Sequence, residues 1–143
     1  PRNERPDNDD VLIGTLRYMA PERLLDQCDE RSDIYSLGVT LYELVTLQPA
    51  FQDPDRQTLA EMVLRCEPAP PRKLAPKIPQ PLETIILTAM ARLPENRYAT
   101  ARALAADLLR FANGQPIDAR APTLGDRLLR WYARRASDLR GGQ

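Results

Sequence analysis

The segment DERSDIYSLGVTLYELVTL, residues 29–47, decides the fold. Its apolar residues recur at steps of three and four, which predicts one helix that is buried on most of its sides. Ser32 and Asp33 lie where the helix needs oxygen acceptors for its unpaired amides, and Asp29, Glu30 and Asp33 place negative charge at its expected N-terminus. Gly38 lies in its middle, where glycine costs roughly 1 kcal/mol relative to alanine, so we expect another backbone to approach closely there. The expected buried positions are Ile34, Leu37, Val39, Leu41, Tyr42, Leu44, Val45 and Leu47.

Length and composition point to one modest domain, because the chain has 143 residues of which 43% are hydrophobic and 28% charged. The formal net charge is zero, so no strong overall field favours nucleic acid. Two cysteines and no histidine exclude a disulfide framework and give no basis for a metal site. No apolar run reaches about 18 residues and the first ten residues are polar, so neither a membrane span nor a signal peptide is expected. These features predict a cytoplasmic protein.

Three further amphipathic helices are predicted downstream. They cover residues 57–66, residues 82–92 after Pro81, and a segment that begins at a Thr100 cap and ends at Asn113 and Gly114. Between the first two, residues 67–81 contain six prolines, which predicts a long extended loop without regular helix. The expected fold is therefore mainly α with long loops. The inward positions are Leu59, Met62, Val63, Leu82, Ile85, Ile86, Ala89, Met90, Leu104, Leu108 and Phe111.

The sharpest motif is GTLRYMAPE, residues 14–22. Locally, Gly14 gives backbone freedom and Pro21 suits the first turn of a short helix through Leu25. Together with SDIYSLG at 32–38 and PENR at 94–97, it closely resembles the end of the activation segment and the later helices of eukaryotic-type (Hanks-type) protein kinases, in particular bacterial serine/threonine kinases. The resemblance covers residues 11–112. It implies the helical C-terminal lobe of the kinase fold over residues 1–114, followed by a basic amphipathic tail over residues 115–143.

The resemblance also implies an activity for the intact protein. Such kinases transfer the γ-phosphate of ATP, with Mg²⁺, to serine or threonine of protein substrates. None of the motifs GxGxxG, VAIK, HRD or DFG is present, so we expect that the chain begins after them, contains no catalytic residue or metal site, and by itself neither binds ATP nor transfers phosphate. Two alternatives stay open, namely a catalytically inactive, kinase-derived binding or scaffold module, and a truncated gene product.

By resemblance, the substrate platform and its supports are assigned residue by residue. The platform consists of Gly14, Thr15, Leu16, Arg17, Tyr18 and Met19, and its structural supports are Ala20, Pro21, Glu22, Asp33, Gly38 and Arg97. Thr15 is expected to orient the catalytic aspartate of the intact kinase, and a plain turn residue is the alternative. Glu22 and Arg97 are expected to form a buried ion pair. Asp33 is expected to accept backbone amides of the catalytic loop, and therefore to lack those donors here; an ordinary helix cap is the other interpretation.

The tail combines apolar and basic residues at helical spacing. One side holds Leu124, Leu128, Trp131 or Tyr132, and Leu139, and the arginines are Arg127, Arg130, Arg134, Arg135 and Arg140. One interpretation is a solvated helix that packs its apolar edge on the domain, and another is a basic segment lying on an anionic membrane surface, which would make the full-length protein membrane-associated. Nucleic-acid binding is disfavoured because the basic residues are few and Asp126 and Asp138 oppose them.

Overall fold

The computed structural model describes residues 13–123, 125–126, 128–129, 132 and 135–136. Its elements are η1 (Pro21–Leu25), α2 (Glu30–Thr46), α3 (Arg56–Arg65), α4 (Pro71–Leu74), α5 (Gln80–Ala89), η2 (Pro94–Asn96) and α6 (Ala101–Ala112). A short helical turn at residues 13–16 precedes them, and the described residues contain no strand. The predicted mainly helical fold is therefore confirmed. None of the helices in this described part is both long and apolar enough to span a bilayer.

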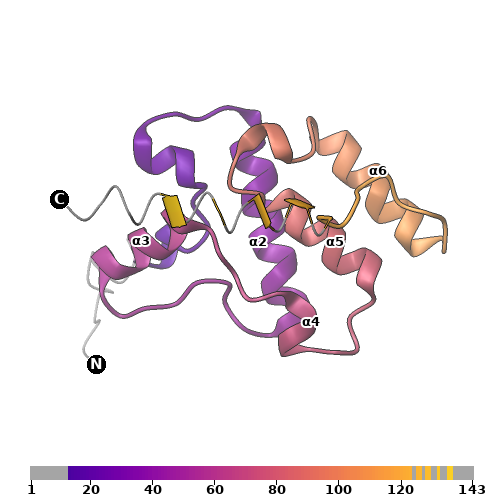
Figure 1. The fold of residues 1–143 in the computed structure, drawn as a ribbon, viewed down its shortest axis with the longest axis horizontal. Helices are drawn as coiled ribbons and strands as arrows, with labels where there is room; N and C mark the ends of the chain where they lie inside the picture. The colour runs from indigo at the N-terminus through magenta and orange to yellow at the C-terminus, as the bar shows by residue number, and fades with distance from the viewer. Residues whose placement is uncertain (1–12, 124, 127, 130–131, 133–134, 137–143) are drawn as a thin grey trace, which may run out of the picture.

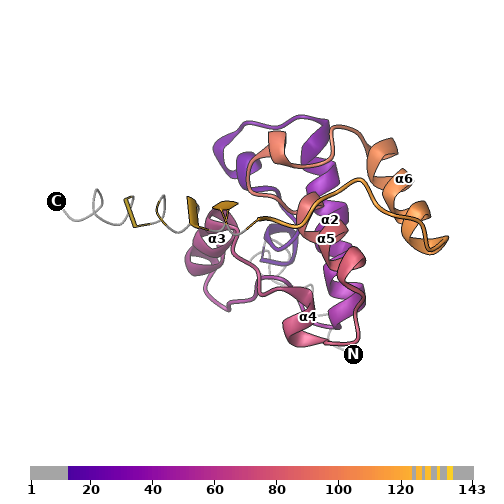
Figure 2. The same ribbon diagram turned by 45° about the vertical axis from the view of Figure 1, so that its right-hand side comes forward.

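The helix α2 lies at the centre of the molecule, with α5 packed beside it, α3 on one side and α6 on the other (Figure 1 and Figure 2). It begins after Asp29, whose carboxylate accepts a hydrogen bond from the Arg31 backbone N–H at 2.8 Å. The prediction that most of its sides are buried is wrong in part. Ile34, Val39 and Tyr42 are buried as expected. Three leucines are not, because the neighbouring helices cover only one side of α2: Leu37 is 49% exposed, Leu44 67% and Leu47 87%.

The close approach predicted at Gly38 is confirmed. A Cβ atom at this position would lie 2.8 Å from the Ala89 Cβ and 2.9 Å from the Met90 Cγ. Ala89 is the last residue of α5 and Met90 is its C-cap, so the missing side chain is what lets α2 and α5 pack at this point. The same contact explains why a mid-helix glycine is tolerated despite its cost in helix propensity.

The core consists of two clusters that share α2 and α5. The first core cluster joins the N-terminal segment, α2 and α3, and contains Leu16, Ala20, Tyr35, Val39, Tyr42, Phe51, Leu59, Val63, Ile86 and Met90. The second core cluster joins α2, α5 and α6, and contains Ile34, Ile85, Ala89, Tyr98 and Leu104. The inward positions predicted for α3, α5 and α6 are confirmed, because each lies in or against one of these clusters.

The proline-rich segment is not wholly extended, which corrects the prediction for residues 67–81. It contains the four-residue helix α4, which begins at Pro71 after Pro70. A proline at the first helical position removes an amide that would have no partner within the helix, so proline favours this start and excludes only a longer helix. Tyr42 of α2 fixes the segment further, because its hydroxyl donates to the Ala69 carbonyl at 2.7 Å.

Candidate functional site

The candidate site begins with residues 14–19, which we call the platform segment. Leu16 is buried in the first core cluster, and so is Ala20 directly after the segment, whereas Thr15 is exposed. Met19 packs against the same cluster from a half-buried position. A Cβ atom at Gly14 would have no neighbour within 4 Å, so the close packing seen at Gly38 is not what requires glycine here. The segment is thus anchored on one side and presents Thr15 on the other.

Two contacts from α2 fix the platform segment at Tyr18. The Ser36 hydroxyl donates to the Tyr18 carbonyl at 2.7 Å. The Tyr18 hydroxyl donates to the carboxylate of Glu43, two helical turns further along, and this hydrogen bond raises the pKa of Tyr18. Next to Tyr18, the Arg17 Nε is buried and has no hydrogen-bond partner among the described residues. The sequence analysis did not identify Ser36 or Glu43, since both lie on α2 and only the fold brings them to residues 14–19.

The predicted ion pair between Glu22 and Arg97 is confirmed. The Arg97 Nη1 lies 2.6 Å from Glu22 Oε1 and its Nη2 lies 2.8 Å from Oε2, so the guanidinium binds the carboxylate with two parallel hydrogen bonds. The Arg97 side chain is 0% exposed and that of Glu22 is 11% exposed. Burial disfavours the charged form of Glu22, but hydrogen bonds from Arg97 and Ser32 outweigh this effect and lower the pKa of Glu22.

Arg97 also donates hydrogen bonds to three backbone carbonyls, one in the first turn of α2 and two directly after α5. Its guanidinium donates to the carbonyls of Ala91 at 2.7 Å, Arg31 at 3.0 Å and Arg92 at 3.1 Å. The same group lies 5.0 Å from the centre of the Tyr35 ring, a distance suited to a cation–π contact. Arg97 therefore joins η1, the start of α2 and the end of α5.

The structure contradicts the expectation that Asp33 lacks hydrogen-bond donors in this chain, whereas its role toward the catalytic loop stays a prediction. Its side chain is 77% exposed and forms an ion pair with Arg23 at 2.9 Å, so it is neither buried nor left without a donor. It also does not cap α2, because Asp29 takes that position. Asp33 lies on the outward side of the first turn of α2, and the neighbouring η1 supplies the arginine that pairs with it.

A second buried acid, Asp107 in α6, was missed by the sequence analysis. Its carboxylate accepts from the Tyr98 hydroxyl at 2.8 Å and from the backbone N–H groups of Asp118 at 2.8 Å and Ala119 at 2.9 Å. Arg110 pairs with it at 2.8 Å. Burial alone would raise the pKa of Asp107, but these hydrogen bonds lower it to about 2. The only signal in the sequence was that Asp107 lies three residues after the inward-facing Leu104, and therefore on the same face of α6.

The tail starts with a helix cap that the sequence analysis also missed. The Thr123 hydroxyl accepts from the Asp126 N–H at 3.2 Å, and the Asp126 carboxylate accepts from the Thr123 N–H at 2.9 Å, which is a reciprocal capping box. Leu128 and Tyr132 of the predicted apolar side are exposed. Of the other apolar and basic residues predicted in the tail, the following lie outside the described residues: Leu124, Arg127, Arg130, Trp131, Arg134, Leu139 and Arg140.

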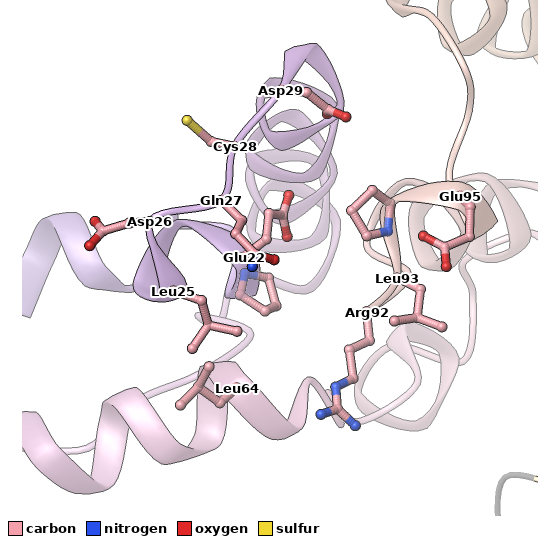
Figure 3. A pocket seen from close by; sticks show the side chains of 12 residues that line it. Glu22, Leu25, Asp26, Gln27, Cys28, Asp29, Leu64, Arg92, Leu93 and Glu95 are labelled. Carbon is pink, nitrogen blue, oxygen red and sulfur yellow. The ribbon is translucent and has the colours of Figure 1, made fainter.

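A pocket of about 620 Å³ opens beside Glu22, between η1, α3 and the segment 92–95 (Figure 3). Its lining residues are Pro21, Glu22, Leu25, Asp26, Gln27, Cys28, Asp29, Leu64, Arg92, Leu93, Pro94 and Glu95. No group of three or more His, Cys, Asp or Glu side chains in the described part of the chain is arranged to hold a metal ion.

Comparison with known proteins gives consistent matches. The family model for the protein kinase domain matches residues 2–109. The serine/threonine-protein kinase PknB of Mycobacterium leprae is 42% identical over 110 residues, which cover 76% of this chain and 18% of that protein. A probable serine/threonine-protein kinase of Streptomyces coelicolor is 37% identical over 112 residues, covering 78% of this chain and 17% of that protein. The tyrosine-protein kinase MasK of Myxococcus xanthus is 43% identical over 102 residues, covering 71% and 16%. The chain thus spans less than a fifth of the length of these curated relatives.

Proposed function

This chain belongs to the protein kinase family and is similar to bacterial serine/threonine kinases, and we propose that the full-length protein transfers the γ-phosphate of ATP to serine or threonine of protein substrates. In this proposal the platform segment binds the substrate chain next to the acceptor residue. ATP with Mg²⁺ supplies the phosphoryl group, and residues outside this chain bind both. The described residues hold the substrate in position, and such positioning is a large part of catalysis in phosphoryl transfer.

The exposure of Thr15 is the observation on which the proposal rests. Its neighbours Leu16 and Ala20 are buried and the Tyr18 carbonyl is held by Ser36, so the backbone around Thr15 is fixed from several sides. A short polar side chain on a fixed, exposed backbone is suited to orient a catalytic group. We propose that its hydroxyl orients the catalytic aspartate of the full-length protein, and that residues 16–19 contact the substrate residue that follows the acceptor.

Substitution of Thr15 in the full-length protein tests this role. Thr15→Ala should lower kcat/KM for a protein substrate by about 100-fold, because a misplaced reacting group costs that much, and should leave the melting temperature unchanged. Thr15→Ser keeps the hydroxyl and should retain most of the activity. Thr58→Ala is the matched control, since Thr58 is also an exposed threonine but lies on α3, where its hydroxyl donates to Asp55. Full activity of the Thr15→Ala variant would contradict the proposal.

The acceptor residue needs its own experiment, because the M. xanthus relative is named a tyrosine-protein kinase. We expect phosphoserine or phosphothreonine when the substrate labelled by the full-length protein is hydrolysed and its phosphoamino acids are separated. The resemblance of residues 14–22 to serine/threonine kinases supports this expectation. Phosphotyrosine as the sole product would contradict it.

The 143-residue chain alone should not transfer phosphate, because its sequence contains none of the family's ATP-binding motifs. Incubation of this chain with ATP, Mg²⁺ and a protein substrate should give no labelled product, whereas the full-length protein should. If the full-length protein also fails to bind ATP, the scaffold interpretation replaces the kinase proposal. The well-anchored platform segment would then serve binding alone.

A further inference from the structure

The pocket beside Glu22 has two apolar walls, and we call it the acidic groove. In Figure 3, Leu25 of η1 and Leu64 of α3 face each other on one side, and Arg92 and Leu93 lie on the other. Leu25 is 61% exposed and Leu93 is 49% exposed, so both walls offer apolar surface to a partner. The volume of about 620 Å³ is within the range of pockets that hold a ligand, and it can accept one or two large side chains.

Carboxylates dominate the charge of the acidic groove. Four acids line it against one base, Arg92; the acids are Glu22, Asp26, Asp29 and Glu95. Glu22 and Asp29 are bound by Arg97 and Arg31, respectively. Asp26 and Glu95 are exposed and form no ion pair with a described residue. The acidic groove therefore suits a partner segment that combines a large apolar side chain with positive charge.

The tail of this chain has that chemistry. Residues 123–143 contain five arginines and two aspartates, a net charge of +3, so residues 1–122 have a net charge of −3. Leu128, Leu129 and Tyr132 are exposed in the described part of the tail, which is capped by Thr123. In Figure 1 the described part of the tail runs from near α5 toward the side on which α3 lies, and Leu64 of α3 also lines the acidic groove.

We propose that the acidic groove binds residues 123–140 of a second copy of the chain. Within one copy, Leu25 and Leu93 of the groove are exposed, and so are Leu128 and Leu129 in the described part of the tail, so these side chains do not cover each other. A contact between copies buries both sets and places arginines beside Asp26 and Glu95. The contact is head-to-tail, so it uses different surfaces on the two copies. It is independent of phosphoryl transfer and can be tested on this chain without ATP.

The first test measures self-association of the 143-residue chain by sedimentation equilibrium over a range of concentrations. The wild-type chain should associate, and the association should weaken as salt is raised, because exposed charges are screened. Glu95→Lys should weaken the dissociation constant at least about tenfold, equivalent to 1.4 kcal/mol. Glu61→Lys is the matched control, since it makes the same charge change on α3 outside the acidic groove. Wild-type chain that stays monomeric, or equal effects of both substitutions, would overturn the proposal.

The apolar part of the contact has an equivalent test. Leu93→Ser should also weaken self-association, whereas Leu109→Ser removes a similarly exposed leucine from α6 and should not. Both substitutions are on the surface, so the chain should fold in each case, and a thermal melt checks this. If Leu109→Ser weakens association as much as Leu93→Ser, general stickiness of exposed leucines explains the association and the acidic groove does not.

A mixing experiment identifies the two partner surfaces directly. A groove variant, Asp26→Asn with Glu95→Lys, keeps an intact tail, and a tail variant, Leu128→Ser with Arg135→Glu, keeps an intact groove. Asparagine suits position 26 because Asp26 has a φ of 55°, which asparagine tolerates. Neither variant should self-associate, but an equimolar mixture should form a 1:1 complex through the one intact groove and the one intact tail. A mixture that stays monomeric would overturn the proposal.

An anionic membrane surface is the competing partner for the tail. Sedimentation with vesicles of phosphatidylcholine and phosphatidylserine tests it on the same proteins. Under our proposal the wild-type chain self-associates in the absence of lipid and Glu95→Lys weakens that association. If instead the chain is monomeric and binds the vesicles, and only the tail variant loses this binding, the tail recognises lipid and the proposal is wrong.

Discussion

Replacement of Arg97 by alanine removes the largest set of polar contacts from a single side chain in the described structure. Arg97 makes five hydrogen bonds, two to the Glu22 carboxylate and three to the carbonyls of Ala91, Arg31 and Arg92. Its side chain is fully buried, so water does not reach these groups while the fold is intact. Arg97→Ala therefore leaves the Glu22 carboxylate with only the Ser32 hydroxyl as a side-chain donor and removes one donor from each of three carbonyls.

The expected loss in the free energy of unfolding is about 3–5 kcal/mol, the usual result of removing one partner of a buried ion pair. Most of this loss is the cost of leaving the Glu22 carboxylate without its partner, and the cation–π contact with Tyr35 adds a smaller part. A domain of this size has a total stability of roughly 5–15 kcal/mol, so the variant should be much less stable but partly folded. Arg97→Lys should be only partly better, because lysine cannot bind a carboxylate with two parallel hydrogen bonds.

Urea unfolding of the 143-residue chain, followed by circular dichroism, measures the effect. Arg102→Ala is the matched control, since Arg102 is an exposed arginine of α6 and its removal should change stability by no more than about 0.5 kcal/mol. The difference between wild type and Arg97→Ala should shrink as the pH falls. In the wild type the lowered pKa of Glu22 means that protonation destabilises the fold, whereas in the variant protonation relieves a stranded charge. A loss below about 1 kcal/mol, or a difference that does not change with pH, would refute this reasoning.

Three further predictions concern the core and the α6 end. Gly38→Ala should lower stability by about 1–2 kcal/mol in thermal melts, because the new Cβ meets Ala89 at 2.8 Å and overpacking outweighs the gain in helix propensity; an increase in stability would contradict the packing. Asp107 has a pKa of about 2 in place of 3.8, so the stability that it contributes is complete above about pH 4 and is lost as the pH falls toward 2. On acid titration, the wild-type chain should therefore lose about 2 kcal/mol of stability that the Asp107→Asn variant does not lose. Tyr98→Phe should cost about 1–2 kcal/mol in urea unfolding, since Asp107 loses a buried donor, and no loss would contradict that contact.

The helices could be predicted from the sequence because their apolar spacing records which side of each is buried. Ile85, Ile86 and Ala89 form such a side on α5, and all three are buried. Gly38 was informative for the same reason, since a mid-helix glycine has a cost that only a close neighbour explains. The ion pair between Glu22 and Arg97 is different. The two residues are far apart in sequence, and only the resemblance of their motifs to protein kinases predicted that they meet.

The errors have one physical cause. Hydrophobic spacing shows which face of a helix is apolar, but it does not show whether another element packs on that face. Leu37 and Leu44 fit the helical pattern of α2 as well as Tyr35 does, but no described helix packs over them. Asp33 was expected to lack hydrogen-bond donors in this chain, whereas Arg23 reaches it at the surface. Asp107 was missed because its partners at residues 118–119 are backbone amides, which leave no trace in the side-chain pattern.

The segment PENRY, residues 94–98, explains how the platform end and the α6 end form one structure. The backbone at Arg97 is extended, with a φ of −85° and a ψ of 176°, so the side chains of Arg97 and Tyr98 point to opposite sides. Arg97 binds Glu22 directly after the platform segment, and Tyr98 enters the second core cluster and binds Asp107. Asp107 in turn holds the backbone at residues 118–119, ahead of the tail. Two adjacent residues thus connect the proposed substrate platform to the start of the tail. An extended backbone makes this possible, because it directs Arg97 toward Glu22 and Tyr98 toward Asp107 on the opposite side.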